Sequence, residues 1–213
     1  MKTKILALIA MTVTMTATAL WAGDTSALRP PAGNRMAIVV FEDLQCPACA
    51  AAEPALEKAV QDYRIPLVRH DFVIKAHNWS AQAHIIARYF DVQSPQLGEE
   101  FRRYIFANQR SIYNEGTLRQ FADKFAQAHH TALPQFVDPM GRFRNEIDAD
   151  TELGLHTGDG VKHTPTIYVV TDSAQLPPRE VENASKLFET IDQMKSALPP
   201  ASKTTKAKTT AKK

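Results

Sequence analysis

The only two cysteines of the 213-residue chain, Cys46 and Cys49, are separated by two residues. The pair follows a short apolar run, Met36 to Phe41, and precedes an alanine-rich stretch with helical character. Two thiols at this spacing can share one reversible disulfide, in which a thiolate attacks or leaves. The sequence therefore points first to thiol–disulfide exchange.

The elements around the motif are expected to activate the first thiol. We predict that Cys46 is the N-cap of a helix over residues 48–62, with Pro47 at the first helical position, where its missing N–H costs nothing. Unpaired backbone N–H groups and the positive end of the helix dipole then favour a thiolate at Cys46. Cys49 lies one turn further on and is expected to be more buried, which suits a resolving thiol. Pro47 and Ala48 are the residues between them.

A structural disulfide is the alternative, because two cysteines in an oxidising compartment usually form a static bridge. A bridge across only two intervening residues removes little entropy from the unfolded chain. It would therefore add little stability, and redox chemistry explains the pair better.

The two ends of the chain differ from its middle. Residues 1–22 carry two lysines, then an uncharged apolar and threonine-bearing segment and small residues, as in a secretory signal peptide. An uncleaved membrane anchor is the alternative for this segment. Residues 23–35 are expected to form a linker, and the lysine-rich residues 199–213 a disordered tail. We therefore expect an exported protein, periplasmic or otherwise outside the cytoplasm.

The composition fits a soluble globular protein, with 44% apolar and 23% charged residues. The net charge of +2 is positive only because the signal contributes two lysines and the tail five. Residues 23–200 hold 18 basic and 23 acidic residues, a balance of about −5. The basic ends are therefore no argument for nucleic-acid binding.

The apolar patterns predict a strand–helix–strand unit, a helical region and a return to strand. A parallel, right-handed crossover is expected for the first unit. The strand following the turn at 171–179 has no clear pattern. The expected strands span 36–41, 65–74 and 164–170, and the expected helices 48–62, 81–90, 95–108, 117–129, 134–155 (broken near 139–141) and 183–197.

The chain resembles the thioredoxin superfamily, and within it the DsbA-like exported thiol:disulfide oxidoreductases. The matching segments are F-E-D-L-Q-C-P-A-C, the helix proline Pro54 and G-V-K-H-T-P-T-I-Y-V-V. The long separation between Cys46 and Pro165 fits a helical domain inserted into the thioredoxin fold. The resemblance covers residues 36–197.

The resemblance implies an α/β thioredoxin fold, a central mixed sheet flanked by helices, with an inserted helical subdomain. The thioredoxin-fold domain would comprise residues 36–75 and 158–198, and the insertion residues 76–157. It implies that Cys46 is the nucleophile, that Cys49 resolves the mixed disulfide, and that Pro165 follows a cis peptide bond. The exposed backbone of Thr164 would then pair with an extended client segment.

Two departures from the family bear on the strength of the oxidant. The family often has a buried acid six residues before the first cysteine, whereas this chain has Val40, and the spacing of Glu42 and Asp43 does not fit a simple replacement. The strongest oxidants have histidine between the cysteines, where this chain has Ala48. We predict a less oxidising protein than those. His163, two residues before Pro165, is a candidate substitute cation, with an exposed loop histidine as the alternative.

No metal and no cofactor beyond the Cys46–Cys49 disulfide is expected. His70, His77 and His84 recur every seven residues, but their spacing does not match a zinc site with the two cysteines. The expected partners are client proteins with cysteines and a membrane redox protein that recycles the dithiol. We expect a monomer that acts as an oxidase. A reductase or isomerase kept reduced by a membrane donor, and a non-catalytic binding or chaperone module, are the alternatives.

Overall fold

The computed structural model describes residue 25 and residues 27–200. The expected signal peptide and nearly all of the lysine-rich tail lie outside the described residues. Across the described part of the chain, no helix is both long and apolar enough to cross a membrane.

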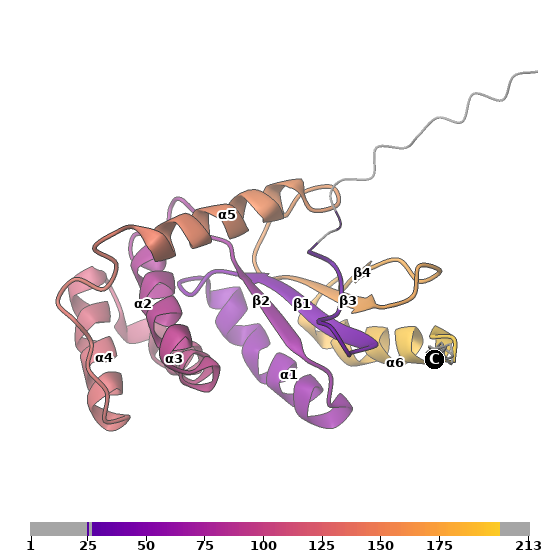
Figure 1. Ribbon diagram of the computed structural model, residues 1–213, viewed down its shortest axis with the longest axis horizontal. Helices are drawn as coiled ribbons and strands as arrows, with labels where there is room; N and C mark the ends of the chain where they lie inside the picture. The colour runs from indigo at the N-terminus through magenta and orange to yellow at the C-terminus, as the bar shows by residue number, and fades with distance from the viewer. Residues whose placement is uncertain (1–24, 26, 201–213) are drawn as a thin grey trace, which may run out of the picture.

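A four-stranded mixed sheet with the order β2-β1-β3-β4 lies at the centre of the fold (Figure 1). β1 (Met36–Glu42) runs parallel to β2 (Leu67–Asp71) and antiparallel to β3 (Thr166–Thr171). β4 (Arg179–Glu180) pairs antiparallel with β3. Every residue of β1 and β3 is buried, as their continuous apolar runs predict for central strands. The expected mixed sheet and its parallel first unit are confirmed.

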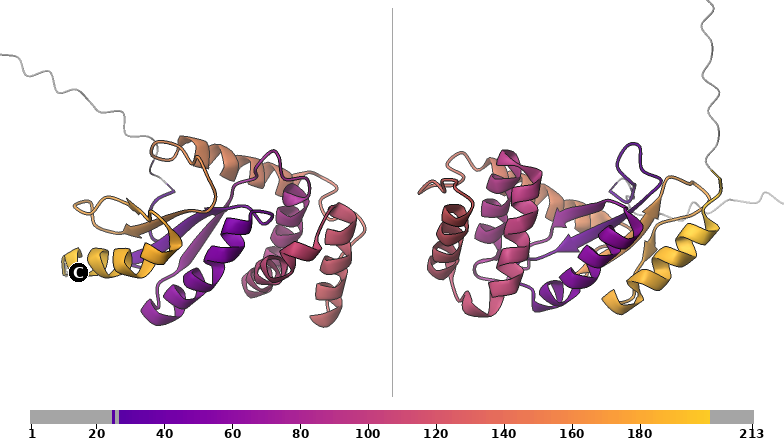
Figure 2. Two further views of the ribbon diagram at one scale, coloured as in Figure 1. Left: turned by 180° about the vertical axis from the view of Figure 1, so that it is seen from behind. Right: turned by 90° about the horizontal axis from the view of Figure 1, so that it is seen from below.

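Helices cover both faces of this sheet (Figures 1 and 2). α1 (Pro47–Tyr63) and α6 (Leu187–Ala197) pack on the face that carries Ile38 and Val40, because alternate residues of a strand point to the same side. The other face carries Val39 and Phe41 in a separate apolar cluster.

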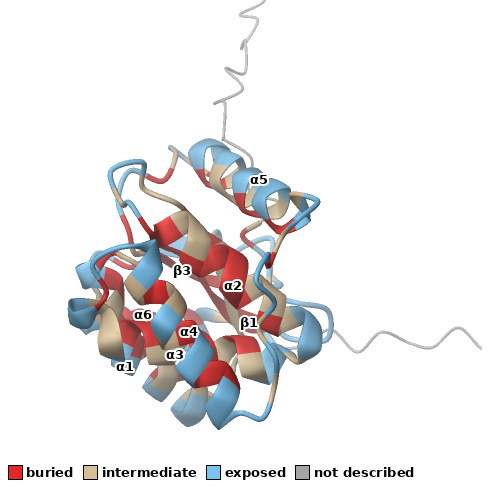
Figure 3. Ribbon diagram, turned by 90° about the vertical axis from the view of Figure 1, so that its left-hand side faces the viewer, coloured by how far each residue is buried: buried red, intermediate tan, exposed pale blue. Residues whose placement is uncertain are grey.

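α5 (Arg142–His156) lies across the face that carries Phe41, with its exposed residues on the outer side (Figure 3). Gly154 makes this contact close, because a Cβ atom there would lie 2.7 Å from the ring of Phe72 and 3.0 Å from that of Phe41. The small residue lets the helix approach the sheet.

Four α-helices stand between β2 and β3 in the chain, which is the expected helical insertion. Their core is aromatic: the ring centroids of Phe90, Phe101 and Phe125 lie 5.0 to 5.2 Å apart. Leu44, Cys46 and Cys49 belong to the same apolar cluster, so the redox motif packs against the insertion. Besides α5, these helices are α2 (Ser80–Gln93), α3 (Pro95–Asn108), followed by the 3₁₀ turn η1 (Gln109–Ser111), and α4 (Glu115–Ala128).

Several expected boundaries are shifted, and three differences matter most. Residues 134–141 are not helical, and α5 begins only after Gly141, whose φ of 68° belongs to the left-handed region. The strand expected over residues 65–74 is confined to Leu67–Asp71. The helix expected from residue 183 begins as a 3₁₀ turn, η2 (Ala184–Lys186), and only then continues as α6. β4, which had no sequence pattern, has two exposed residues.

Candidate redox site

Cys46 is the N-cap of α1, where β1 has just ended. Its backbone is extended, with φ −75° and ψ 119°, and Pro47 begins the helix as expected. The carbonyl of Cys46 accepts hydrogen bonds from the N–H groups of Cys49 (3.1 Å) and Ala50 (3.2 Å). The Cys46 sulfur lies at the start of this helix, beside the N–H groups of Ala48 and Cys49.

Both cysteines are free thiols with little exposure, 7% for Cys46 and 2% for Cys49. Pro47 and Ala48, between them, are exposed. An approaching molecule therefore meets this dipeptide and the edge of Cys46, while Cys49 stays behind.

The Thr164–Pro165 loop completes the site from 118 residues away in the chain. The peptide bond between these two residues is cis, as the resemblance implies. The Cys46 thiol donates to the carbonyl of Thr164 over 3.3 Å. Thr164 is itself buried, and its hydroxyl oxygen has no hydrogen-bond partner among the described residues. The fold thus brings Cys46, Cys49, Thr164 and Pro165 together.

The two thiols are electrostatically unequal. A hydrogen bond from Cys49 is the main cause that lowers the pKa of Cys46 to about 5; burial opposes it, and the backbone N–H groups of Cys49 and Ala48 lower it further. The pKa of Cys49 is raised, first by burial, then by its bond to Cys46 and by the charge of Glu42. Cys46 is therefore a thiolate at neutral pH while Cys49 keeps its proton.

We expect the thiolate absorbance of the reduced protein to titrate with a midpoint near pH 5, because Cys46 has a pKa of about 5. Cys46→Ser should remove this transition, and Cys49→Ala should raise its midpoint because the main stabilising hydrogen bond is lost. A midpoint near the ordinary cysteine value of about 8.5 in the unsubstituted protein would contradict the activation of Cys46.

A buried charged cluster lies beneath α1, and the sequence interpretation missed it. Arg69 on β2 pairs with Glu42 at 2.7 Å, Glu53 at 2.7 Å and Glu99 at 2.9 Å. Burial raises the pKa of Glu42 to about 7, although Arg69 pulls it down. The spacing of Glu42 from Cys46 does not match that of the family's buried acid, so spacing alone does not identify it. Strand alternation is the signal that finds it, since Glu42 shares the α1 face with Val40.

His163 is exposed, and only its backbone takes part in the loop, where the carbonyl accepts from the Thr166 hydroxyl over 2.7 Å. Its ring forms no hydrogen bond or ion pair with any described residue. The structure therefore gives no support to a role for His163 in tuning Cys46.

The three histidines that recur every seven residues pair with three different carboxylates. His70 lies 3.0 Å from Asp150, His77 3.1 Å from Asp43, and His84 2.7 Å from Asp71. Within residues 27–200 no group of three or more histidine, cysteine or acidic side chains is placed to hold a metal ion.

A cavity of about 580 Å³ opens beside the motif, between the start of α1 and the end of α3. Trp79, Phe106 and Ile112 are its buried residues, and Arg110 is its one charged residue. It provides a partly apolar surface next to the exposed Pro47. The remaining lining residues are Gln45, Ala50, Ala51, Ala107 and Gln109.

Comparison with known proteins places this site in a family. A family model described as thioredoxin matches residues 18–192. The chain belongs to the thioredoxin family. A search of curated proteins gives no match.

The solved structures that this thioredoxin-family chain resembles include DsbA-type proteins. Pseudomonas aeruginosa DsbA2 has a TM-score of 0.60 at 18% identity, with 82% of this chain and 96% of that chain covered. Oxidised BdbD from Bacillus subtilis has a TM-score of 0.63 at 16% identity, covering 83% and 96%. A periplasmic thioredoxin-like protein from Salmonella enterica serovar Typhimurium has a TM-score of 0.60 at 18% identity, covering 78% and 88%. At these identities the likeness shows the fold.

Proposed function

We propose that the protein is an exported thiol:disulfide oxidoreductase that passes the Cys46–Cys49 disulfide to client proteins. The observation that carries this proposal is the inequality of the two thiols: a Cys46 with a lowered pKa beside the cis Thr164–Pro165 bond, and a buried Cys49 with a raised pKa. A static disulfide needs no such inequality.

In the proposed reaction a client thiolate attacks the sulfur of Cys46. The bond between Cys46 and Cys49 breaks, and Cys49 leaves with the electron pair and takes up a proton, which its raised pKa favours. A second client thiolate then attacks the client sulfur of the mixed disulfide, and Cys46 leaves as a thiolate. The client is oxidised by two electrons and the protein is reduced to its dithiol.

The low pKa of Cys46 supports the oxidising direction. A thiol with a low pKa is the better leaving group, and a stabilised thiolate favours the reduced form of the protein. In the mixed disulfide Cys46 is therefore the favoured leaving group, and the new disulfide forms within the client. The exposed dipeptide and the neighbouring cavity leave room for an extended client segment beside Cys46.

The protein would work after export from the cytoplasm. The signal-like N-terminus supports export, and so does the likeness to the periplasmic thioredoxin-like protein of Salmonella enterica. A membrane redox partner would reoxidise the dithiol after each cycle. The protein would act as a monomer and use no cofactor or metal besides its own disulfide.

The test is the equilibrium of the Cys46–Cys49 pair with glutathione, together with oxidation of a reduced, unfolded client. We expect the oxidised protein to form client disulfides, with a potential more negative than the value of about −120 mV for DsbA, since Ala48 supplies no cation within the motif. A potential near that of thioredoxin, about −270 mV, with the pair reduced in cells, would instead assign the protein as a reductase. Failure of the disulfide to exchange with any thiol would leave only a binding module.

A further inference from the structure

The segment that leads into the redox motif is a β-turn in which neither the N–H nor the carbonyl of Leu44 has a backbone partner. Asp43 to Cys46 form the turn, which the Cys46 N–H closes by donating to the Asp43 carbonyl over 2.9 Å. The N–H and carbonyl of Leu44 then need partners from elsewhere, because Leu44 is fully buried and water does not reach it.

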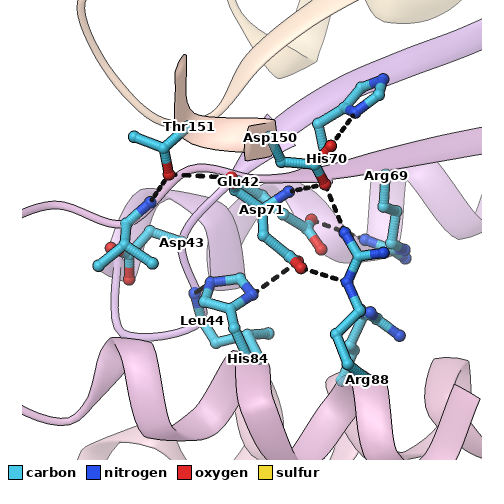
Figure 4. A network of polar contacts seen from close by, with 12 residues as sticks. Glu42, Asp43, Leu44, Arg69, His70, Asp71, His84, Arg88, Asp150 and Thr151 are labelled. Carbon is cyan, nitrogen blue, oxygen red and sulfur yellow. Dashed lines mark hydrogen bonds and ion pairs between the residues drawn. The ribbon is translucent and has the colours of Figure 1, made fainter. Parts of the chain in front are cut away.

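His84 supplies one of these partners from α2. The Leu44 N–H donates to Nε2 of His84 over 3.1 Å, and Nδ1 of His84 lies 2.7 Å from the Asp71 carboxylate (Figure 4). An N–H group can only donate, so Nε2 carries no proton and Nδ1 is the donor to Asp71. Each side of the buried imidazole therefore has one fixed role.

The orientation of His84 is itself secured. Arg88, one turn further along α2, donates to the second oxygen of Asp71 over 2.6 Å and also to Asp150 on α5 (Figure 4). Asp71 thus has a charged partner on one oxygen and His84 on the other. The carboxylate cannot turn away from His84 without also breaking its 2.6 Å bond to Arg88, so the ring stays aimed at Leu44.

Gln109 supplies the other partner from the turn that follows α3. Its side-chain amide donates to the carbonyl of Leu44 over 2.9 Å and to that of Cys46 over 3.1 Å. The backbone of Leu44 is therefore held at its N–H by a residue of α2 and at its carbonyl by a residue of η1. Both holding residues belong to the helical insertion and neither touches a sulfur atom in the described contacts.

We propose that His84 and Gln109 are positioning residues, through which the helical insertion fixes the backbone of Leu44 and so sets the thiol chemistry of Cys46. The link runs through the turn itself. On one side of Leu44, the Asp43 N–H points to the sulfur of Cys49 at 3.5 Å, and on the other, the turn places Cys46 at the helix N-terminus. Movement of the Leu44 backbone therefore changes the surroundings of the Cys46 and Cys49 thiols together.

The test uses variants that remove one hydrogen bond at a time. In His84→Leu the ring nitrogens are lost, whereas His84→Gln keeps an acceptor for Leu44 and a donor for Asp71. Gln109→Met keeps the length of a half-buried side chain without its amide, so this variant should fold even where His84→Leu does not. Tyr89→Phe, which removes a 2.8 Å bond from α2 to the Ala132 carbonyl, is the control away from the turn.

Two quantities are measured: the pKa of Cys46 by thiolate absorbance, and the equilibrium constant with glutathione. We expect His84→Leu and Gln109→Met each to raise the pKa by about one unit and to make the disulfide less oxidising by about tenfold, or about 30 mV. The equilibrium constant of His84→Gln should stay within about threefold of that of the unsubstituted protein. Tyr89→Phe should match the unsubstituted protein in both quantities.

Unchanged values in Gln109→Met would overturn the proposal, and so would equal shifts in Tyr89→Phe, which would indicate general loosening of the insertion. A His84→Gln variant that behaves like His84→Leu would overturn the role assigned to the His84 hydrogen bond. The inference rests on the proposed function only in taking Cys46 as the reacting thiol. Neither measurement uses a client, so a failure to oxidise clients would leave this test intact.

Discussion

Cys46→Ser is expected to abolish disulfide transfer to clients, with a rate below about 1% of that of the unsubstituted protein. The serine hydroxyl cannot form the intramolecular disulfide, and the remaining thiol, Cys49, is 2% exposed and has a raised pKa. The measurement is the rate at which a reduced, unfolded client gains disulfides from the oxidised protein.

Cys49→Ser is the matched control, because it removes one sulfur from the same helix but leaves the reactive one. With a preformed mixed disulfide between Cys46 and a client that has one cysteine, this variant should hold the client, since neither Cys49 nor a second client thiol can attack the bond. Transfer that survives in Cys46→Ser but not in Cys49→Ser would reverse the roles given to the two cysteines. Transfer that survives in both would place the activity outside the motif.

The central part of the fold could be predicted because each piece has a local signal. The run Met36 to Phe41 is apolar throughout, as a strand buried on both faces must be. Cys46 followed by Pro47 indicates a helix start, and α3 has the predicted bounds because Pro95 marks its first position. The contact between Cys46 and Thr164, by contrast, followed from family resemblance, since nothing local joins residues 118 apart.

The charged cluster could not be read in the same way. Arg69, Glu53 and Glu99 come from β2, α1 and α3, and each would be an ordinary surface residue of its own element. Only the packing of the three elements brings them together and buries the Arg69 and Glu53 side chains, while Glu99 stays partly exposed. Glu42 does have a local signal, the strand face that it shares with Val40. Its distance in sequence from Cys46, which differs from that of the family's buried acid, hides this signal. The two-residue β4 has no apolar pattern because both of its residues are exposed.

Arg69→Met is expected to be strongly destabilising, by about 3–5 kcal/mol at pH 8. The methionine replaces most of the volume of the arginine stem but leaves Glu42 and Glu53 without the cation that pairs with them at 2.7 Å. Both carboxylates are almost fully buried, so water cannot replace Arg69. Urea unfolding of the variant and the unsubstituted protein, compared at the same pH, measures the loss.

The loss should depend on pH, and its sign follows from Glu42. Its pKa is raised in the folded protein from about 4.5 to about 7, so its protonated form favours the fold. That contribution is complete below the unfolded value and is lost as the pH rises through the folded one. Arg69 lowers the pKa of Glu42, so Arg69→Met raises it further, and the loss should be smaller at pH 5 than at pH 8.

The double variant Glu42→Gln/Arg69→Met separates the charge from the packing. Because it removes the fully buried carboxylate along with its partner, it should be more stable at pH 8 than Arg69→Met alone and should lose most of the pH dependence. Arg69→Lys keeps the charge without the planar fork that reaches three carboxylates, so its stability should lie between those of Arg69→Met and the unsubstituted protein. If Arg69→Met lost equal stability at both pH values, the cause would be packing. Glu42 would then not be the group whose ionisation Arg69 stabilises beneath the redox motif.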